Sequence, residues 1–214
     1  MKKILFVGHG GFDEAPPEHS GAGAVPDRSR LEQGLRRLPL MDYWDIDPEQ
    51  LEFSRRVRRI CEDCPRYGRS WSCPPAVGTV EQCRERCLGY GRCLLICTAW
   101  EPEPGGGWQE GQRLHEEVTR QVGALFREQG VEPYVLSSQS CDLCRPCLCT
   151  VGRPCPHPAQ MPRCLEGHGI NLMACLAQLG VESTPADPVI RWYSMLFYAP
   201  AHGGRIGLLR NSCD

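Results

Sequence analysis

The chain has 214 residues, and its 24 lysines and arginines against 26 aspartates and glutamates give a formal net charge of −2. This near-neutral balance excludes the basic surface of a general nucleic-acid-binding protein, and the length fits one domain of ordinary size. Hydrophobic residues make up 41% of the chain, which is enough to bury a core.

The sequence contains 15 cysteines and no apolar run long enough to cross a bilayer, for which about 20 residues are needed. The apolar stretch at residues 4–7 ends at Gly8, short of the core of a signal peptide, which spans about 7–15 apolar residues. We therefore expect a cytoplasmic protein without membrane contact. Because disulfides are rare in that reducing compartment, the cysteines indicate metal ligands or redox chemistry.

The first 40 residues differ from the rest of the chain. A short strand is expected at residues 4–7, followed by a segment rich in glycine, proline and alanine and by a helix at residues 29–38. We interpret residues 1–40 as a loosely ordered N-terminal extension, and residues 41–214 as one Cys-rich metal-binding domain.

Local patterns predict the elements of this domain in chain order. Residues 51–53 are expected to be extended, and Thr79 with Gln82 forms a capping box that begins a helix running to about residue 89. The apolar run at residues 92–98 has the length of a strand covered on both faces. Apolar residues at helical spacing then predict a helix over residues 110–129.

The second half of the domain repeats this alternation. A strand at residues 131–137 precedes a Cys-rich loop, a helix at residues 170–179 and a last strand at residues 189–198, whose direction the pattern leaves open. The order predicts an α+β fold, in which helices pack on a small mixed sheet and two Cys-rich loops project from it.

The first Cys-rich loop carries a C-x2-C pair, Cys61 and Cys64, and a third thiol at Cys73. Two residues between thiols let a turn aim both sulfur atoms at one metal, and Cys73 can return from the loop as a third ligand. A fourth ligand is either Cys83 or Cys87, one helical turn apart, or it is absent and one metal position stays open.

The second loop places Cys141, Cys144 and Cys147 in C-x2-C-x2-C spacing, and Cys155 follows before a proline. This spacing is similar to the ligand run of bacterial ferredoxins, although seven residues separate Cys147 from the final Cys-Pro, where the ferredoxin run has three. Zinc in paired knuckles is the alternative. A third cysteine in the same turn fits around a cluster more naturally than around a single ion. Together with ligation by thiolates alone, this favours an iron–sulfur cluster.

The other cysteines and histidines are expected to have lesser roles. Cysteines in the apolar segments are expected to behave as small buried hydrophobes, and Cys213 as a free thiol near the terminus. His157 and His168 are expected at the surface or behind the metal ligands, and His115 with Glu116 on a solvated helix face. The cysteines expected to be buried are Cys93, Cys97 and Cys175.

Together these motifs resemble a family of predicted metal-binding proteins, the domain of unknown function 2284. The resemblance spans residues 43–199 and rests on Cys61, Cys64, Pro65, Tyr67, Gly68, Trp71, Ser72, Cys73, Pro74, Pro75, Cys141, Cys144, Cys147, Pro154, Cys155, His157, Pro158, Glu166, Gly169 and Ile170. It implies a soluble iron–sulfur or metal-binding domain. The family usually has a small hydroxyl residue where this chain has Cys164, so Cys164 is an extra ligand or a neutral replacement.

Three functions are consistent with these residues. The first is a protein that binds one or two 4Fe–4S clusters and exchanges electrons with a redox partner protein. The second is an enzyme whose cluster at Cys61, Cys64 and Cys73 keeps an open iron for a small anionic or sulfur-containing substrate, held by Arg66 and Arg69. The third is an interaction module stabilised by zinc.

Overall fold

The computed structural model describes residues 25–102, 107–181 and 189–200. The strand expected at residues 4–7 and Cys213 lie outside the described residues.

A five-stranded mixed sheet forms the centre of the described part of the chain. Its strand order is β1-β2-β5-β3-β4, with antiparallel pairing throughout except between β3 and β4, which run parallel. The last strand, β5, therefore runs antiparallel to both of its neighbours. The strands are β1 (Asp42–Ile46), β2 (Tyr90–Trp100), β3 (Tyr134–Ser137), β4 (Arg163–Cys164) and β5 (Ile190–Pro200).

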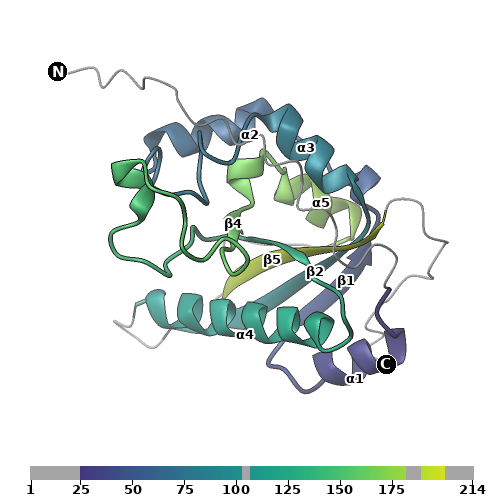
Figure 1. Ribbon diagram of the computed structural model, residues 1–214. Coiled ribbons are helices and arrows are strands. Elements are labelled where there is room, and N and C mark those ends of the chain that lie inside the picture. Colours follow the sequence, from purple (N-terminus) through teal and green to yellow (C-terminus); the bar gives the residue numbers. More distant parts are fainter. Residues whose placement is uncertain (1–24, 103–106, 182–188, 201–214) are drawn as a thin grey trace.

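Helices cover both faces of the sheet (Figure 1). On one face lie α1 (Arg28–Leu35) and α4 (Gln109–Arg127), and on the other lie α2 (Arg55–Arg59), α3 (Val80–Leu88) and α5 (Leu172–Gln178). The α+β class and the mixed sheet with helices packed on it are thus confirmed.

Strand β2 is buried on both faces, as its continuous apolar run predicts. Leu94 and Ile96 join the core beneath α1 and α4, whereas Cys93, Leu95 and Cys97 join the core beneath α3 and α5. This alternation follows from the two-residue side-chain period of a strand. Because both faces need apolar cover, the sheet is held between two separate cores.

Helix α1 belongs to this packing. Leu31 and Leu35 are each 1% exposed and lie in the same core as Val122 and Phe126 of α4. Asp27 caps the helix, since its side chain accepts a hydrogen bond from the backbone N–H of Arg30 at 2.8 Å. Part of the expected extension, from residue 27 onward, therefore contributes to the core of the sheet.

Most local expectations agree with the structure to within a few residues. The capping box at Thr79 and Gln82 is present and begins α3, and the helices α4 and α5 occupy the periodic segments expected for them. The extended segment at residues 51–53 is reduced to a single bridge between Phe53 and Ile170. Three elements were not predicted, namely β1, α2 and β4, and all three are short.

The expectation that His115 faces solvent is wrong. His115 is fully buried between α4 and the sheet, where its Nδ1 lies 2.9 Å from Thr98 Oγ1 and its Nε2 lies 2.7 Å from Ser194 Oγ. Glu116 is half-buried and accepts a hydrogen bond from Ser137 at 2.5 Å. Polar partners on the sheet satisfy these side chains, and helical periodicity alone does not reveal such partners.

Candidate metal centre

Cys61, Cys64 and Cys73 line one cavity, which we call site one. Its volume is about 540 Å³. Cys61 lies in the short 3-10 helix η2 (Ile60–Asp63), Cys64 follows it directly, and Cys73 lies at the far end of the same loop. The start of α4 and the loop after β3 supply the opposite wall, which includes Trp108, Gln112, Ser138, Gln139, Ser140, Asp142 and Arg145.

A fourth cysteine, Cys164, lines the same cavity. It lies on β4, which pairs with β3 so that Cys164 stands opposite Ser137. In the sequence Cys164 has no neighbouring cysteine at metal-ligand spacing, so only a departure from the family pattern drew attention to it. Cys83 and Cys87, considered above as fourth ligands, are fully buried on α3 and are not among the residues that line this cavity.

The thiols of site one differ in their electrostatic surroundings. The pKa of Cys61 lies below its ordinary value, first because it shares a hydrogen bond with the Cys164 side chain and further because Arg58 is close. The same hydrogen bond, followed by burial, raises the pKa of Cys164, and burial raises the pKa of Cys73. Of Cys61, Cys73 and Cys164, Cys61 therefore most readily forms the thiolate that a metal binds.

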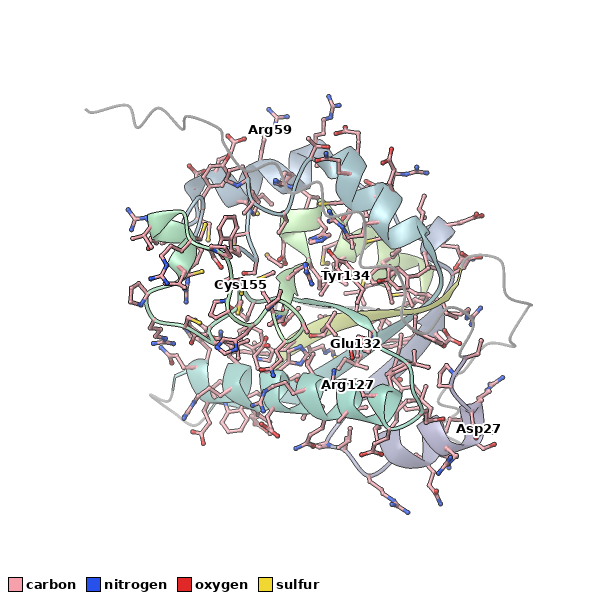
Figure 2. All side chains as sticks on the ribbon, in the orientation of Figure 1. Asp27, Arg59, Arg127, Glu132, Tyr134 and Cys155 are labelled. Carbon is pink, nitrogen blue, oxygen red and sulfur yellow. The ribbon has the colours of Figure 1, made fainter. Side chains whose placement is uncertain are left out.

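Cys141, Cys144, Cys147 and Cys155 line a second cavity, which we call site two. The remaining described residues of its wall are Ser70, Leu143, Leu148, Pro156 and Met161, so this wall contains neither a carboxylate nor an imidazole. Figure 2 shows Cys155 in this loop region. The structure thus brings all four of these cysteines to one place, although 14 positions separate the first from the last.

A backbone amide points at one of the sulfur atoms of site two. The N–H of His157 donates to Cys155 Sγ at 3.4 Å. Such a bond orients a ligand and stabilises sulfur as the thiolate.

Ser72 connects the two sites. Ser72 Oγ lies 3.6 Å from Cys73 Sγ of site one and accepts a hydrogen bond at 2.9 Å from the backbone N–H of Cys141 of site two. It also lies 2.8 Å from Oγ of Ser70, which lines site two. The two Cys-rich loops therefore pack directly against each other, as Figure 1 also shows.

His168 acts on the backbone of site one. It is fully buried, and its Nδ1 lies 2.9 Å from the carbonyl oxygen of Cys164, which can only accept, so Nδ1 carries the proton. Its Nε2 therefore accepts from the Tyr134 hydroxyl at 2.7 Å. Burial lowers the pKa of His168 to about 3, which keeps the ring neutral. His168 positions Cys164 through the main chain.

The remaining described cysteines and His157 line neither cavity. Cys93, Cys97 and Cys175 are buried in the core beneath α3 and α5, as expected. His157 is exposed, and Cys149, in the same loop, is half-buried without lining either cavity.

The thiols surround their cavities without converging on a point. Among the described residues, no group of three or more His, Cys, Asp or Glu side chains has the arrangement needed to hold a metal ion. The cavity of site two measures about 10 Å³, room for roughly one water molecule. In chemical terms both sets suit a metal that prefers sulfur, because each presents four thiols.

Comparison with protein families agrees with this donor chemistry. A family model described as predicted metal-binding protein, DUF2284, matches residues 44–198, a range that contains both sites. The chain belongs to this family. Neither the comparison with curated proteins nor that with solved structures found a match. None of the helices in the described part of this DUF2284 chain is both long and apolar enough to cross a membrane.

Proposed function

We propose that the protein binds iron–sulfur clusters of the 4Fe–4S type and has a redox or electron-transfer role. The observation that carries this proposal is the gathering of Cys141, Cys144, Cys147 and Cys155 around one cavity whose other described walls are a serine and apolar side chains. Thiolate-only ligation in apolar surroundings suits such a cluster, which supplies a one-electron redox centre when bound.

The contact between the two sites supports electron transfer in particular. Ser72 touches Cys73 of site one and Cys141 of site two, so centres held at the two sites would be neighbours. An electron could then enter at one site and leave at the other. Within the protein, the hydrogen bond from the backbone N–H of Cys141 to Ser72 Oγ holds the two loops together.

The surface of the loops suits a protein partner. Residues 54–75 and 140–163 together carry nine arginines against three acidic residues, although the whole chain has a net charge of −2. Large apolar side chains are exposed on the same loops, namely Ile60, Tyr67, Leu143 and Val151. We therefore propose an acidic redox protein as the partner, because opposite charges steer such encounters.

Quantitation of iron and acid-labile sulfide tests the proposal. The protein is purified without oxygen and examined by EPR after reduction. We expect iron and sulfide in equal amounts, and an EPR signal of a reduced cluster. Stoichiometric zinc without sulfide in anaerobically prepared protein would instead assign site two to a single ion, which its small cavity favours.

A matched pair of variants shows whether site two is responsible. Cys144→Ser removes a thiol that lines the cavity, whereas Cys149→Ser removes a thiol of the same loop that lines neither cavity. We expect Cys144→Ser to lose the cluster of site two and Cys149→Ser to keep it. Equal iron content in both variants would contradict the assignment.

The size of site one favours a second candidate, an enzyme that binds a small molecule beside the metal. A volume of about 540 Å³ falls in the range of ligand pockets, and Arg66 and Arg145 line it. Both arginines are hydrogen-bonded to Asp142, which offsets part of their charge. A shift of the EPR signal when small carboxylates or thiols are added to the reduced protein would support this candidate.

A further inference from the structure

We infer that Cys164 is the fourth thiol ligand of site one and closes the coordination that Cys61, Cys64 and Cys73 begin. The inference rests on the proposed function, because it requires a metal or cluster at site one. It assigns a ligand to a position where the sequence shows no metal-binding motif.

Cys164 lines site one together with the three thiols of the first loop. Cys61 and Cys164 come from segments more than 100 residues apart in the chain. The fold therefore brings strand β4 to the cavity that the C-x2-C loop lines.

The main chain around Cys164 is fixed on several sides. The N–H of Cys164 donates to the carbonyl of Ser72 at 3.2 Å, and the carbonyl of Cys164 accepts from His168. The next residue, Leu165, is fully buried, and its N–H donates to Ser137 at 2.9 Å. A ligand needs this kind of preorganised support, because a loosely held thiol does not keep its geometry.

The segments that carry Cys164 and Cys73 pack closely at Gly167. A Cβ atom added at Gly167 would lie 3.2 Å from Cys164 Cβ and 3.2 Å from Cδ of Pro74. Pro74 follows Cys73 directly, so the two ligand segments approach each other across a glycine. The segments that carry Cys73 and Cys164 therefore pack against the same glycine.

The other candidates for the fourth position are placed differently. Cys83 is buried on α3, where its thiol donates to the carbonyl of Val77 at 3.3 Å, and Cys87 belongs to the core. Glu166 lines the cavity and lies 3.1 Å from Cys164 Sγ, but a carboxylate is a harder ligand than a thiolate and suits these soft metals less well. Cys164 is therefore the fourth sulfur that the fold supplies.

A fourth thiol has a consequence for function. With three protein ligands, one iron of a cluster at site one stays free to bind a substrate. With Cys164 bound, all of the irons have protein ligands, and the site suits electron transfer. The inference therefore favours the redox proposal over the enzyme at this site.

Three single variants test the inference in a background where Cys144→Ser disables site two. Cys73→Ser is the reference for loss of a ligand, Cys164→Ser is the test, and Cys83→Ser is the control for loss of a buried thiol. All proteins are purified without oxygen, and iron, acid-labile sulfide and EPR are measured. Thermal unfolding of the metal-free forms checks that each variant folds.

We expect Cys164→Ser to resemble Cys73→Ser, with loss of iron and appearance of the oxidised three-iron signal, whereas Cys83→Ser keeps the iron content of its parent. Iron, sulfide and EPR in Cys164→Ser identical to those of the parent would overturn the inference and leave the proposed function standing. A parent without iron and sulfide at site one would overturn the cluster proposal for that site, and the inference with it.

Alkylation of the wild-type protein gives a readout that needs no variant. Iodoacetamide is applied to the loaded protein and to the metal-stripped protein, and modification of each cysteine is measured by mass spectrometry. We expect Cys164 to be protected only in the loaded form, in parallel with Cys61 and Cys64. Equal modification of Cys164 in both forms would contradict the inference.

Discussion

The histidine at position 115 shows how a single buried polar residue is accommodated. His115 is 0% exposed, and both ring nitrogens have hydroxyl partners, Thr98 on β2 and Ser194 on β5. Thr119, one helical turn further along α4, also donates to Ser194 at 3.0 Å. A buried polar group without partners would be costly, so this network anchors α4 at one place on the sheet.

This network predicts a pH dependence of stability. Burial lowers the pKa of His115 to about 4, below its ordinary value of 6.5. Between these two pH values the His115 side chain binds a proton in the unfolded chain but not in the folded protein. The contribution of His115 to the free energy of unfolding is therefore fully present above about pH 6.5 and is lost as the pH falls toward 4. A shift of this size corresponds to about 3 kcal/mol.

The variant His115→Gln keeps hydrogen-bonding groups at the position but does not titrate. We expect the free energy of unfolding, measured with urea at pH 7 and at pH 4, to fall more steeply in the wild type than in the variant. Taking the difference between the two proteins cancels the contributions of the other titrating groups. Equal losses in both proteins would contradict the explanation.

At the scale of elements, two backbone hydrogen bonds join the segment before Cys61 to the segment after Cys164. The N–H of Ser54 donates to the carbonyl of Gly169 at 2.6 Å, and the N–H of Asn171 donates to the carbonyl of Glu52 at 2.9 Å. Ser54 caps α2, which leads into Cys61, and Gly169 ends the 3-10 turn η4 (Glu166–His168) after Cys164. The pairing therefore fixes the distance between the two thiol-bearing segments.

Gly169 makes this close approach possible. Its φ is 76°, and an added Cβ would lie 3.0 Å from the carbonyl oxygen of Ser54 and 3.0 Å from Val80. Gly152 has a similar φ of 66°, but nothing lies within 4 Å of its added Cβ. Both glycines thus adopt the left-handed backbone conformation, but only Gly169 has atoms close to the position of an added Cβ.

We expect Gly152→Ala to cost about 1–2 kcal/mol, which is the penalty for a left-handed backbone conformation. Gly169→Ala should cost a further 1–3 kcal/mol, roughly, because the added atom meets backbone that cannot move freely. Urea unfolding of both variants measures the difference. An equal loss of unfolding free energy in both variants would mean that the close contact with the Ser54 carbonyl does not contribute to the cost.

At the scale of the whole molecule, regular structure and Cys-rich loops are separated. The sheet and its helices bury two apolar cores, whereas both thiol sites lie among irregular loops. Site one also includes residues of β4 and of the start of α4. Neither apolar core includes a described residue of 61–75 or 141–155, and hydrogen bonds such as that from Trp71 Nε1 to the carbonyl of Arg153, at 2.9 Å, join these loops. A bound metal would therefore stabilise mainly this part of the protein.

Removal of the metal should accordingly lower stability. Since a ligand that binds only the folded state adds to its stability, we expect the midpoint of thermal unfolding to fall by at least about 10 °C on chelation. Limited proteolysis of the stripped protein should cut first within residues 61–75 and 141–155. Identical midpoints and identical cleavage patterns for the loaded and stripped forms would argue against metal at these loops.

Local signals determined much of the fold in advance. The capping box at Thr79, the apolar run of β2 and the periodicity of α4 depend on neighbours a few residues away, and all three elements form as predicted. The two-residue strand β4 has no such local signal, because it forms only by pairing with β3. Strand β1 and helix α2 are likewise too short for a periodic pattern to stand out.

The same division holds for the candidate site. Spacing alone selected Cys61, Cys64, Cys73, Cys141, Cys144, Cys147 and Cys155, because ligands on one turn must be close in sequence. Only the tertiary structure brought Cys164 to the first loop, joined the two sites through Ser72 and buried His115, since each depends on contacts between segments far apart in the chain. Contacts between distant segments leave no pattern in the local sequence, so only the folded structure shows them.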